Sequence, residues 1–180
     1  MTFLEHIQDR SFCMLGFDDD PKSIGYVDYE NEVVTFPLYN LSGQFSGTQI
    51  YRWDKSKEAQ RNPHDQKYFT YAPRGNISVY GLQLLPEGYL GPIYLVEGIW
   101  EVIAGCFFGI PCIAVLGRNP KHLMNWINSI ANPVVVLSQP DEAGKELREY
   151  GKNGYIDLDK DLDDCLRNGG WFGVPRSIKP

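Results

Sequence analysis

The chain has 180 residues, of which 43% are hydrophobic and 22% are charged, and its formal net charge is −6 at pH 7. This length predicts one domain, or one domain with an appendage, which can bury its own core without disulfide bonds. The negative balance argues against a protein that coats nucleic acid through bulk charge, but it leaves open a local basic groove or an acidic cation site.

No targeting segment or membrane span is predicted. Phe3 and Leu4 are followed at once by charged residues, unlike the start of a signal peptide. The longest uncharged apolar run, residues 102–117, is shorter than the about 20 residues that a membrane span needs. The four cysteines have no CxxC spacing, so we expect reduced thiols, no structural zinc and a cytoplasmic location.

The first half of the chain favours β-structure after one short helix. Residues 2–15 are predicted to form that helix, with Thr2 as its cap and Glu5 three residues later. The acidic turn 16–22 is interpreted as a solvated loop in preference to a cation site. Alternating apolar residues and turn signals predict an antiparallel meander with strands at 25–29, 33–39 and 44–53. Shorter extended segments are predicted at 67–71 and 76–82.

From residue 89 the pattern changes to an alternation of strands and helices. We expect strands at 93–97, 112–116, 134–138 and 155–158. We expect helices at 99–107, 119–130, 141–150 and 161–168. This alternation predicts an α/β fold with a parallel sheet and helices on both its faces, and the β-rich first half makes the whole chain α+β. The predicted organisation is a β-rich subdomain at 1–88, an α/β domain at 89–170 and a tail at 171–180.

Acidic residues follow the predicted strands of the second half. They are, in chain order, Glu97, Glu101, Asp141, Asp161 and Asp163. Because the carboxyl ends of parallel strands share one edge of a sheet, we expect these side chains to converge there. Several carboxylate oxygens at one edge are typical of sites that bind one or two Mg²⁺ (or Mn²⁺) ions for phosphoryl chemistry. Gly144 would let the backbone approach such a site closely.

Each acidic residue also has a purely structural interpretation. Asp141 is a favourable helix N-cap, and Glu101 in a first helical turn complements the helix dipole. Residues 161–164 are compatible with the solvated start of a helix. Their joint placement favours a site. Glu97 is the hardest to explain structurally, because it follows an apolar strand and Gly98 comes directly after it.

Two segments of the second half resemble the Toprim motifs of primases, topoisomerases, a nuclease family and recombination mediators. LVEGIWEVIAGCFFGIPCIAVLG (95–117) is similar to the first motif, a strand ending in Glu-Gly, then an acidic residue and a second strand ending in Gly. VVVLSQPDEAGKEL (134–147) resembles the second motif, Asp-x-Asp-x-Ala-Gly, with Gln139 in place of its first Asp.

The other segments narrow the resemblance to the catalytic core of DnaG-type DNA primases, including compact phage relatives. VVTFPLYNLSGQFSGTQIYRW (33–53) and KYFTYAP…VYGL (67–82) are similar to segments that precede Toprim in that family. GYIDLDKDLDDCLRNGG (154–170) resembles its Asp-Pro-Asp segment. The order and approximate spacing of these segments agree over most of the chain, from about residue 24 to residue 170.

The resemblance implies an enzyme of DNA replication, a nucleotidyltransferase that makes short RNA primers on single-stranded DNA from ribonucleoside triphosphates. It implies Mg²⁺ (or Mn²⁺) as cofactor, Glu97 as the catalytic residue, and all five acidic residues as cation ligands. It also implies that Arg52 and Lys67 bind template or nucleotide, with Arg74 beside them in place of the basic residue missing at Gly75. Without the family, the preferred interpretation is an exposed strand charge for Arg52 and a loop charge for Lys67. A replicative helicase or another replisome protein is the implied partner, and a phage source would place the protein in the host cytoplasm.

Two departures from the family pattern keep other functions open. Gln139 removes one negative charge and one strong oxygen ligand from the cation site, and Gly75 stands where the family has a basic residue. A catalytically degenerate Toprim protein that binds nucleic acid or a replication partner is therefore one alternative. A Toprim nuclease is the other, and the primase-like first half argues against it.

Overall fold

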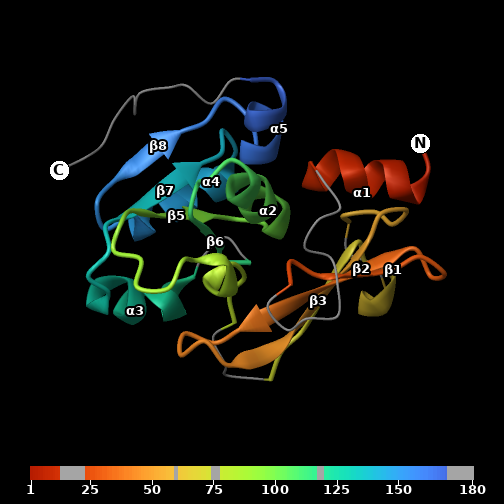
Figure 1. Ribbon diagram of the computed structural model, residues 1–180, viewed down its shortest axis with the longest axis horizontal. Coiled ribbons are helices and arrows are strands. Elements are labelled where there is room, and N and C mark those ends of the chain that lie inside the picture. The colour runs from red at the N-terminus through yellow and green to blue at the C-terminus, as the bar shows by residue number, and fades with distance from the viewer. Residues whose placement is uncertain (13–22, 59–60, 74–77, 117–119, 170–180) are drawn as a thin grey trace. The chain divides into compact units, whose positions relative to one another are not determined.

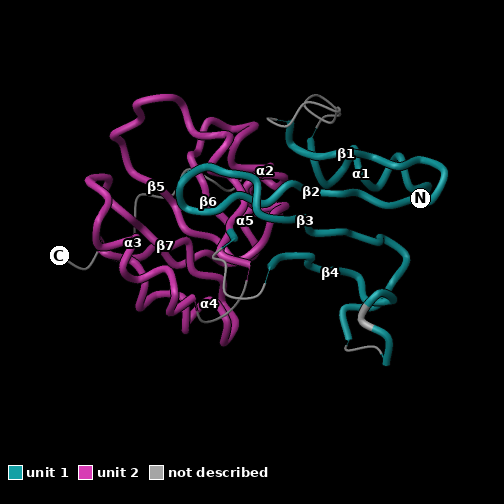
Figure 2. The backbone as a smooth tube through the Cα atoms, turned by 90° about the horizontal axis from the view of Figure 1, so that it is seen from below, with its two compact units in different colours: residues 1–78 teal, residues 79–180 magenta. Residues whose placement is uncertain are grey.

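The computed structural model describes residues 1–12, 23–58, 61–73, 78–116 and 120–169. The chain divides into two compact units, Met1–Ser78 and Val79–Pro180 (Figure 2). The boundary that the sequence suggested, residue 88, lies inside the second unit. Within the described ranges no helix is both long and apolar enough to cross a membrane.

In its described residues, the first unit combines one α-helix with a four-stranded antiparallel sheet (Figure 1). Its elements are α1 (Phe3–Ser11), β1 (Tyr26–Asp28), β2 (Val33–Tyr39), β3 (Phe45–Arg52) and β4 (Tyr68–Tyr71). The strands pair in chain order, as expected of a meander. In β2 every second residue, Val34, Phe36 and Leu38, is fully buried, so the period of two in the sequence follows from one face of the strand packing on the core.

Helix α1 begins as the sequence predicted. The Thr2 hydroxyl accepts a hydrogen bond from the Glu5 N–H at 3.3 Å, and Glu5 Oε2 accepts one from the Thr2 N–H at 2.7 Å, which closes a capping box. Phe3 and Ile7 lie one helical turn apart and are both buried. The helix ends at Ser11, so its predicted end at residue 15 is wrong. Phe12 adopts a left-handed conformation with φ 60°, which cannot continue a right-handed helix.

Close packing of β3 against the end of β4 gives a first testable prediction. Gly47 has φ 159°, and an added Cβ would overlap the Tyr71 carbonyl oxygen. We expect Gly47→Ala to lower the free energy of unfolding by roughly 3 kcal/mol, measured by urea denaturation. Gly43→Ala is the control, because its Cβ would meet no atom within 4 Å and only its positive φ of 75° should cost about 1 kcal/mol. Equal losses in the two variants would contradict the close contact.

The described part of the second unit contains a four-stranded parallel sheet and four α-helices (Figure 1). The strands are β5 (Ile93–Val96), β6 (Cys112–Ala114), β7 (Val134–Ser138) and β8 (Tyr155–Asp157), in the spatial order β6-β5-β7-β8. The helices are α2 (Ile99–Phe107), α3 (Met124–Ser129), α4 (Glu142–Leu147) and α5 (Leu162–Arg167). Every residue of β7 is buried, as the unbroken apolar run predicts for an inner parallel strand. The predicted α/β class, a parallel sheet with flanking helices after a β-rich part, is confirmed.

Three elements differ in detail from the prediction. The helix expected at 119–130 begins, in its described part, with a 3₁₀ turn at Lys121–Leu123, and the one expected at 141–150 ends in a 3₁₀ turn at Arg148–Tyr150. The described part of 76–82 is not a continuous strand: Tyr80 forms a single antiparallel bridge with Ala114. A 3₁₀ turn at Leu82–Leu84 follows and ends the pairing. Through this bridge Tyr80 pairs with β6 of the second unit.

Candidate functional site

The junction of β5 and α2 holds the first pair of predicted site residues. β5 ends at Val96, and the half-buried Glu97 follows it directly. Gly98 is the N-cap of α2, and its N–H donates a hydrogen bond to Glu101 Oε2 at 2.9 Å. Because this bond closes the first turn of α2, the local sequence alone fixes Glu101 near the carboxyl end of the sheet.

Glu101 is a buried carboxyl group with one unused oxygen. The residue is 4% exposed, and its Oε1 makes no hydrogen bond within the described residues. Burial raises the pKa of Glu101 to about 7; hydrogen bonds from the Gln139 side chain and the Gly98 N–H oppose this rise, and the charges of Asp161 and Asp163 add to it. An orphaned buried carboxylate oxygen is costly, so a group that supplies positive charge or a proton would stabilise it.

Helix α5 brings two further acidic residues to Glu101. Asp161 occupies the N-cap position of α5, and Asp163 lies in its first turn with 2% exposure. Both act electrostatically on Glu101, so these three carboxylates converge although α2 and α5 lie far apart in the sequence. Arg167 offsets part of their charge, because its Nη2 lies 3.8 Å from Asp163 Oδ2. Their role as cation ligands remains a prediction.

The junction of β7 and α4 carries Gln139 and Asp141. Gln139 is 9% exposed and reaches Glu101 with its side chain. Asp141 is the exposed N-cap of α4, and its Oδ1 accepts the Gly144 N–H at 2.8 Å, which is the structural role that its position predicted. The Ser138 hydroxyl donates to the Gly144 carbonyl at 3.0 Å and accepts from Arg148 Nε at 2.8 Å. These bonds hold the turn after β7 against the start of α4.

The second unit offers donors of the right chemistry for a cation, but not a preformed cage. Within the described ranges no three His, Cys, Asp or Glu side chains are grouped so that they could hold a metal ion. Glu101, Asp161 and Asp163 nevertheless act on one another electrostatically, and Glu101 Oε1 lacks a partner among the described residues. The residues therefore fit a hard divalent cation in donor type, provided that side chains at this edge adjust around it.

A basic cluster lies in the first unit, and we define it as Arg10, Arg52, Lys57 and Lys67. The Arg52 N–H donates to the Lys67 carbonyl at 2.8 Å, which places these two residues on adjacent strand ends. Partial burial lowers the pKa of Lys67, and the charges of Lys57 and Arg10 lower it further. Positive charges that act on one another in this way favour the binding of a polyanion such as a phosphate backbone, and Asp54 offsets part of the charge at Lys67. Arg74 lies outside the described residues.

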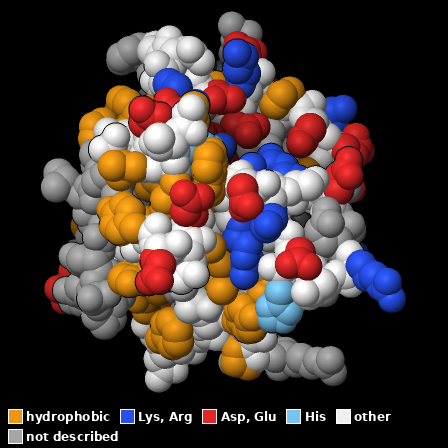
Figure 3. All heavy atoms as spheres, turned by 90° about the vertical axis from the view of Figure 1, so that its right-hand side faces the viewer, with side chains coloured by type: hydrophobic (Ala, Val, Ile, Leu, Met, Phe, Trp, Pro, Cys, Tyr) orange, Lys and Arg blue, Asp and Glu red, His pale blue; other side chains and the backbone are white. Residues whose placement is uncertain are grey.

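Two members of the basic cluster, Arg10 and Lys57, were missed in the sequence. No local pattern connects α1 with the loop before β4, so only the tertiary fold brings their charges to Lys67. Aromatic side chains support this part of the unit: Lys67 Nζ lies 5.6 Å from the Tyr51 ring centroid, and the Tyr51 hydroxyl is hydrogen-bonded to His6 Nε2 at 2.6 Å. Tyr51 is fully buried, so it packs in the core of this unit and presents no ring face to a base. Figure 3 shows basic side chains interspersed with acidic ones on one face of the molecule, so positive charge there is local.

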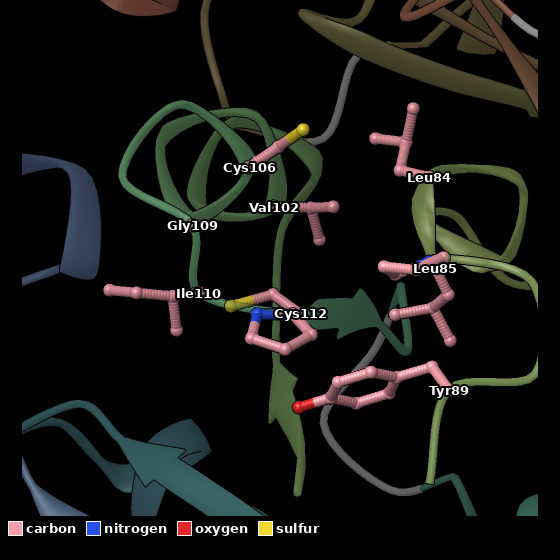
Figure 4. A pocket seen from close by; sticks show the side chains of 10 residues that line it. Leu84, Leu85, Tyr89, Val102, Cys106, Gly109, Ile110 and Cys112 are labelled. Carbon is pink, nitrogen blue, oxygen red and sulfur yellow. The ribbon is translucent and has the colours of Figure 1, made fainter. Parts of the chain in front are cut away.

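A cavity of about 240 Å³ lies elsewhere in the second unit (Figure 4). Its lining includes Leu84, Leu85, Tyr89, Val102, Cys106 and Cys112. Burial raises the pKa of the Cys112 thiol well above its usual range, so this thiol stays protonated. Among the described residues that line the cavity there is no carboxylate or basic side chain, so they offer no charged partner to a hard cation or a phosphate.

Comparison with known proteins defines the class of fold. No protein-family model matches the sequence, and no curated protein is similar to it in sequence. Among solved structures, the chain has the α/β fold of DNA primase catalytic cores. The resemblance to DnaG-type primases inferred from the sequence motifs is thereby confirmed at the level of the fold.

Three of these structures give the extent of the similarity. The Escherichia coli primase catalytic core is 21% identical with a TM-score of 0.56, over 77% of this chain and 49% of that one. A DnaG primase catalytic domain bound to single-stranded DNA is 20% identical with a TM-score of 0.57, over 77% and 48%. The primase fragment of the bacteriophage T7 primase-helicase protein is 14% identical with a TM-score of 0.56, over 77% and 58%. The chain thus spans about half the length of the primase structures that it matches.

Proposed function

We propose that this chain is a primase-type nucleotidyltransferase, which makes short RNA primers on single-stranded DNA with the help of a divalent cation. The observation that carries the proposal is the carboxylate group of the second unit. Buried Glu101, with its unused Oε1, lies close to the end of β5, and the charges of Asp161 and Asp163 act on it. In a primase-like fold such an edge supports phosphoryl transfer.

The reaction joins two nucleotides on the template. The 3′-hydroxyl oxygen of one forms a bond to the α-phosphorus of the other, the bond to pyrophosphate breaks, and the hydroxyl proton is released. Mg²⁺ or Mn²⁺, held by Glu97, Glu101, Asp141, Asp161 and Asp163, would neutralise charge on the phosphate oxygens and lower the pKa of the hydroxyl. Half-buried Glu97, directly after β5, accepts the hydroxyl proton in this scheme. Arg52 and Lys67 hold phosphates of the template or the triphosphate, since positioning dominates such catalysis.

Two of the similar primase structures support the proposed substrates and partner. One primase domain of the same fold is bound to single-stranded DNA, and the T7 fragment comes from a primase-helicase protein. We therefore propose single-stranded DNA and ribonucleoside triphosphates as substrates and a replicative helicase, or another replisome protein, as partner. The basic cluster of the first unit is the part of this chain that would contact the nucleic acid.

Primer synthesis with labelled ribonucleotides on single-stranded DNA tests the proposal. With Mg²⁺ or Mn²⁺ the wild-type protein is expected to make short RNA, and Glu97→Gln to reduce the rate by about 100-fold or more. Glu87→Gln is the matched control, because Glu87 is exposed and belongs to the same unit. The absence of RNA from the wild type and from Gln139→Asp, with and without a replicative helicase, would reject the polymerase function. Cleaved template in place of RNA would instead identify a nuclease.

A second function, a primase-fold module that binds nucleic acid without catalysis, is favoured by one observation. Gln139 stands where the motif has a carboxylate, and no preformed three-ligand group exists in the described ranges. Such a module would bind single-stranded DNA equally well in EDTA and in Mg²⁺, and Lys67→Ala would weaken that binding. Fluorescence anisotropy with labelled DNA separates it from a polymerase, which must depend on the cation.

A further inference from the structure

Three aromatic side chains of the first unit, His64, Phe69 and Tyr71, pack against one another, and we call them the ring cluster. The His64 ring centroid lies 4.4 Å from that of Phe69, and the Phe69 centroid lies 4.5 Å from that of Tyr71. The Tyr71 hydroxyl is hydrogen-bonded to His64 Nδ1 at 2.7 Å. His64 belongs to the 3₁₀ turn Pro63–Asp65 and the other two rings belong to β4, so contacts between two elements fix the cluster.

The ring cluster lies on the face of the antiparallel sheet that does not pack on the core. Phe69 and Tyr71 are two residues apart in β4, so they lie on the same face, opposite Ile50 and Thr48 of β3. Those two residues of β3 are half-buried, whereas Tyr51, on the other face, is fully buried. Tyr71 is 44% exposed and Phe69 is half-buried, so a flat molecule can reach the rings from solvent.

Basic residues border the ring cluster. Arg52 follows Ile50 by two residues in β3, so it lies on the same face as Phe69 and diagonally across from it, within reach of a long side chain. Lys67 directly precedes β4, and its carbonyl accepts the Arg52 N–H at 2.8 Å. The exposed Asp65 of the 3₁₀ turn offsets part of this positive charge. Charge alone therefore gives modest affinity here, and the rings add a contact that a nucleic-acid base can use.

We propose that the ring cluster is a stacking site for a base of single-stranded nucleic acid, and that Arg52 holds a phosphate beside that base. A base laid on an exposed ring removes apolar surface of both from water. Rings that already hold one another lose little conformational freedom when the base binds. The inference rests on the proposed function in taking single-stranded nucleic acid as the ligand, and it adds the residues and the chemistry that bind its bases.

Two strands of equal charge separate base stacking from phosphate binding. One is an oligothymidylate of about twelve nucleotides, and the other is the same backbone without bases. Both carry a fluorescent label, and anisotropy is measured in EDTA so that no divalent cation contributes. We expect the wild type to bind the thymidylate at least about tenfold more tightly than the abasic strand, and Phe69→Leu and Tyr71→Leu each to lose most of that preference.

Two further variants show that the effect belongs to the ring cluster. Lys67→Ala should weaken the binding of both strands alike, because a lysine contacts phosphates. Phe45→Leu removes an aromatic ring that is 64% exposed in the same sheet but outside the ring cluster, and it should leave both Kd values unchanged. Urea denaturation checks that each variant folds. If Phe69→Leu is unfolded, Tyr71→Leu decides, because its side chain is exposed.

Each outcome decides for or against the inference. Equal affinity of the wild type for the two strands would overturn it, as would a preference for bases that Tyr71→Leu retains. Self-association that Tyr71→Leu abolishes, with the base preference unchanged, would assign the ring cluster to a contact between two copies instead. Primer synthesis is scored separately. A base preference that depends on the ring cluster, without primers, would retain the inference and reject the polymerase, whereas primers without such a preference would do the reverse.

Discussion

Glu101→Gln is expected to stabilise the protein above pH 7 and to remove a pH dependence that the wild type shows in mildly acidic solution. The pKa of Glu101 in the folded protein is about 7, against an ordinary value of 4.5, chiefly because the side chain is buried. Between these two values the folded protein binds more protons than the unfolded chain. The free energy of unfolding therefore falls as the pH rises through this window, and the loss is complete above pH 7.

The size of the effect follows from the shift. A difference of about 2.5 pH units corresponds to about 3 kcal/mol, which is large for a single side chain. Glutamine resembles the protonated carboxyl group, so wild type and Glu101→Gln should have similar stabilities at pH 4.5 and differ by up to about 3 kcal/mol at pH 8. Urea denaturation in EDTA at pH 4.5 and pH 8 measures the unfolding free energy of both proteins. Glu87→Gln, a change at an exposed position, is the control.

A divalent cation should make the wild type more stable than Glu101→Gln at pH 8, the reverse of the order expected without the cation. Mg²⁺ or Mn²⁺ at pH 8 would stabilise the wild type, whose Glu101 can ionise beside the ion, and would act less on Glu101→Gln. A stability difference between the two proteins that stays the same at pH 4.5 and pH 8 would show that Glu101 is not the buried acid of this edge. An unchanged response to the cation in Glu101→Gln would show that Glu101 takes no part in binding it.

The elements with strong periodicity were predictable from the sequence. The unbroken apolar run of β7, the alternation in β2 and the capping box of α1 all act through neighbouring residues, and local physics determines them. Elements that depend on weak local preferences came out differently. The helix expected at 119–130 begins in its described part as a 3₁₀ turn, and Tyr80 pairs through a single bridge. In such short segments, tertiary packing overrides weak local preferences.

The candidate site was predictable in its positions but not in its partners. The predicted ends of two strands indicated where Glu97 and Gln139 would lie. In the structure Leu95 pairs with Val136, so these two strands end side by side at the same edge of the sheet. The effect of Gln139, Asp161 and Asp163 on the pKa of Glu101 could not be predicted, because it depends on side-chain geometry across separate elements. The sequence indicated only a missing ligand at position 139. By contrast, the ion pair between Asp163 and Arg167 could be predicted, because the two residues are four positions apart on one helix.

Gly144→Ala is expected to destabilise the protein by about 3 kcal/mol, although alanine is the better helix former by about 1 kcal/mol. An added Cβ would lie 2.5 Å from the Gln139 nitrogen and 2.8 Å from its carbonyl carbon, and it would overlap the carbonyl oxygen. These are backbone atoms, so no flexible side chain can move aside. The turn after β7 must shift instead, against the bonds that Asp141 and Ser138 make to Gly144 at 2.8 and 3.0 Å.

The same substitution should therefore disturb the candidate site as well as the fold. A shift of the turn moves the backbone of Gln139 and the neighbouring Asp141, a predicted cation ligand, so the Kd for Mn²⁺ should change together with the unfolding free energy measured in urea. Gly98→Ala is the matched control at the start of α2: its Cβ would lie at an ordinary 3.6 Å from Glu101 Oε2, and a cost below about 1 kcal/mol is expected. If Gly144→Ala were as stable as the wild type, the turn after β7 would be able to shift at little cost, and the close approach of Gln139 would not constrain it. The sequence Ala143-Gly144 predicts a close approach of the backbone at this point; the structure shows that what comes close is the chain's own Gln139.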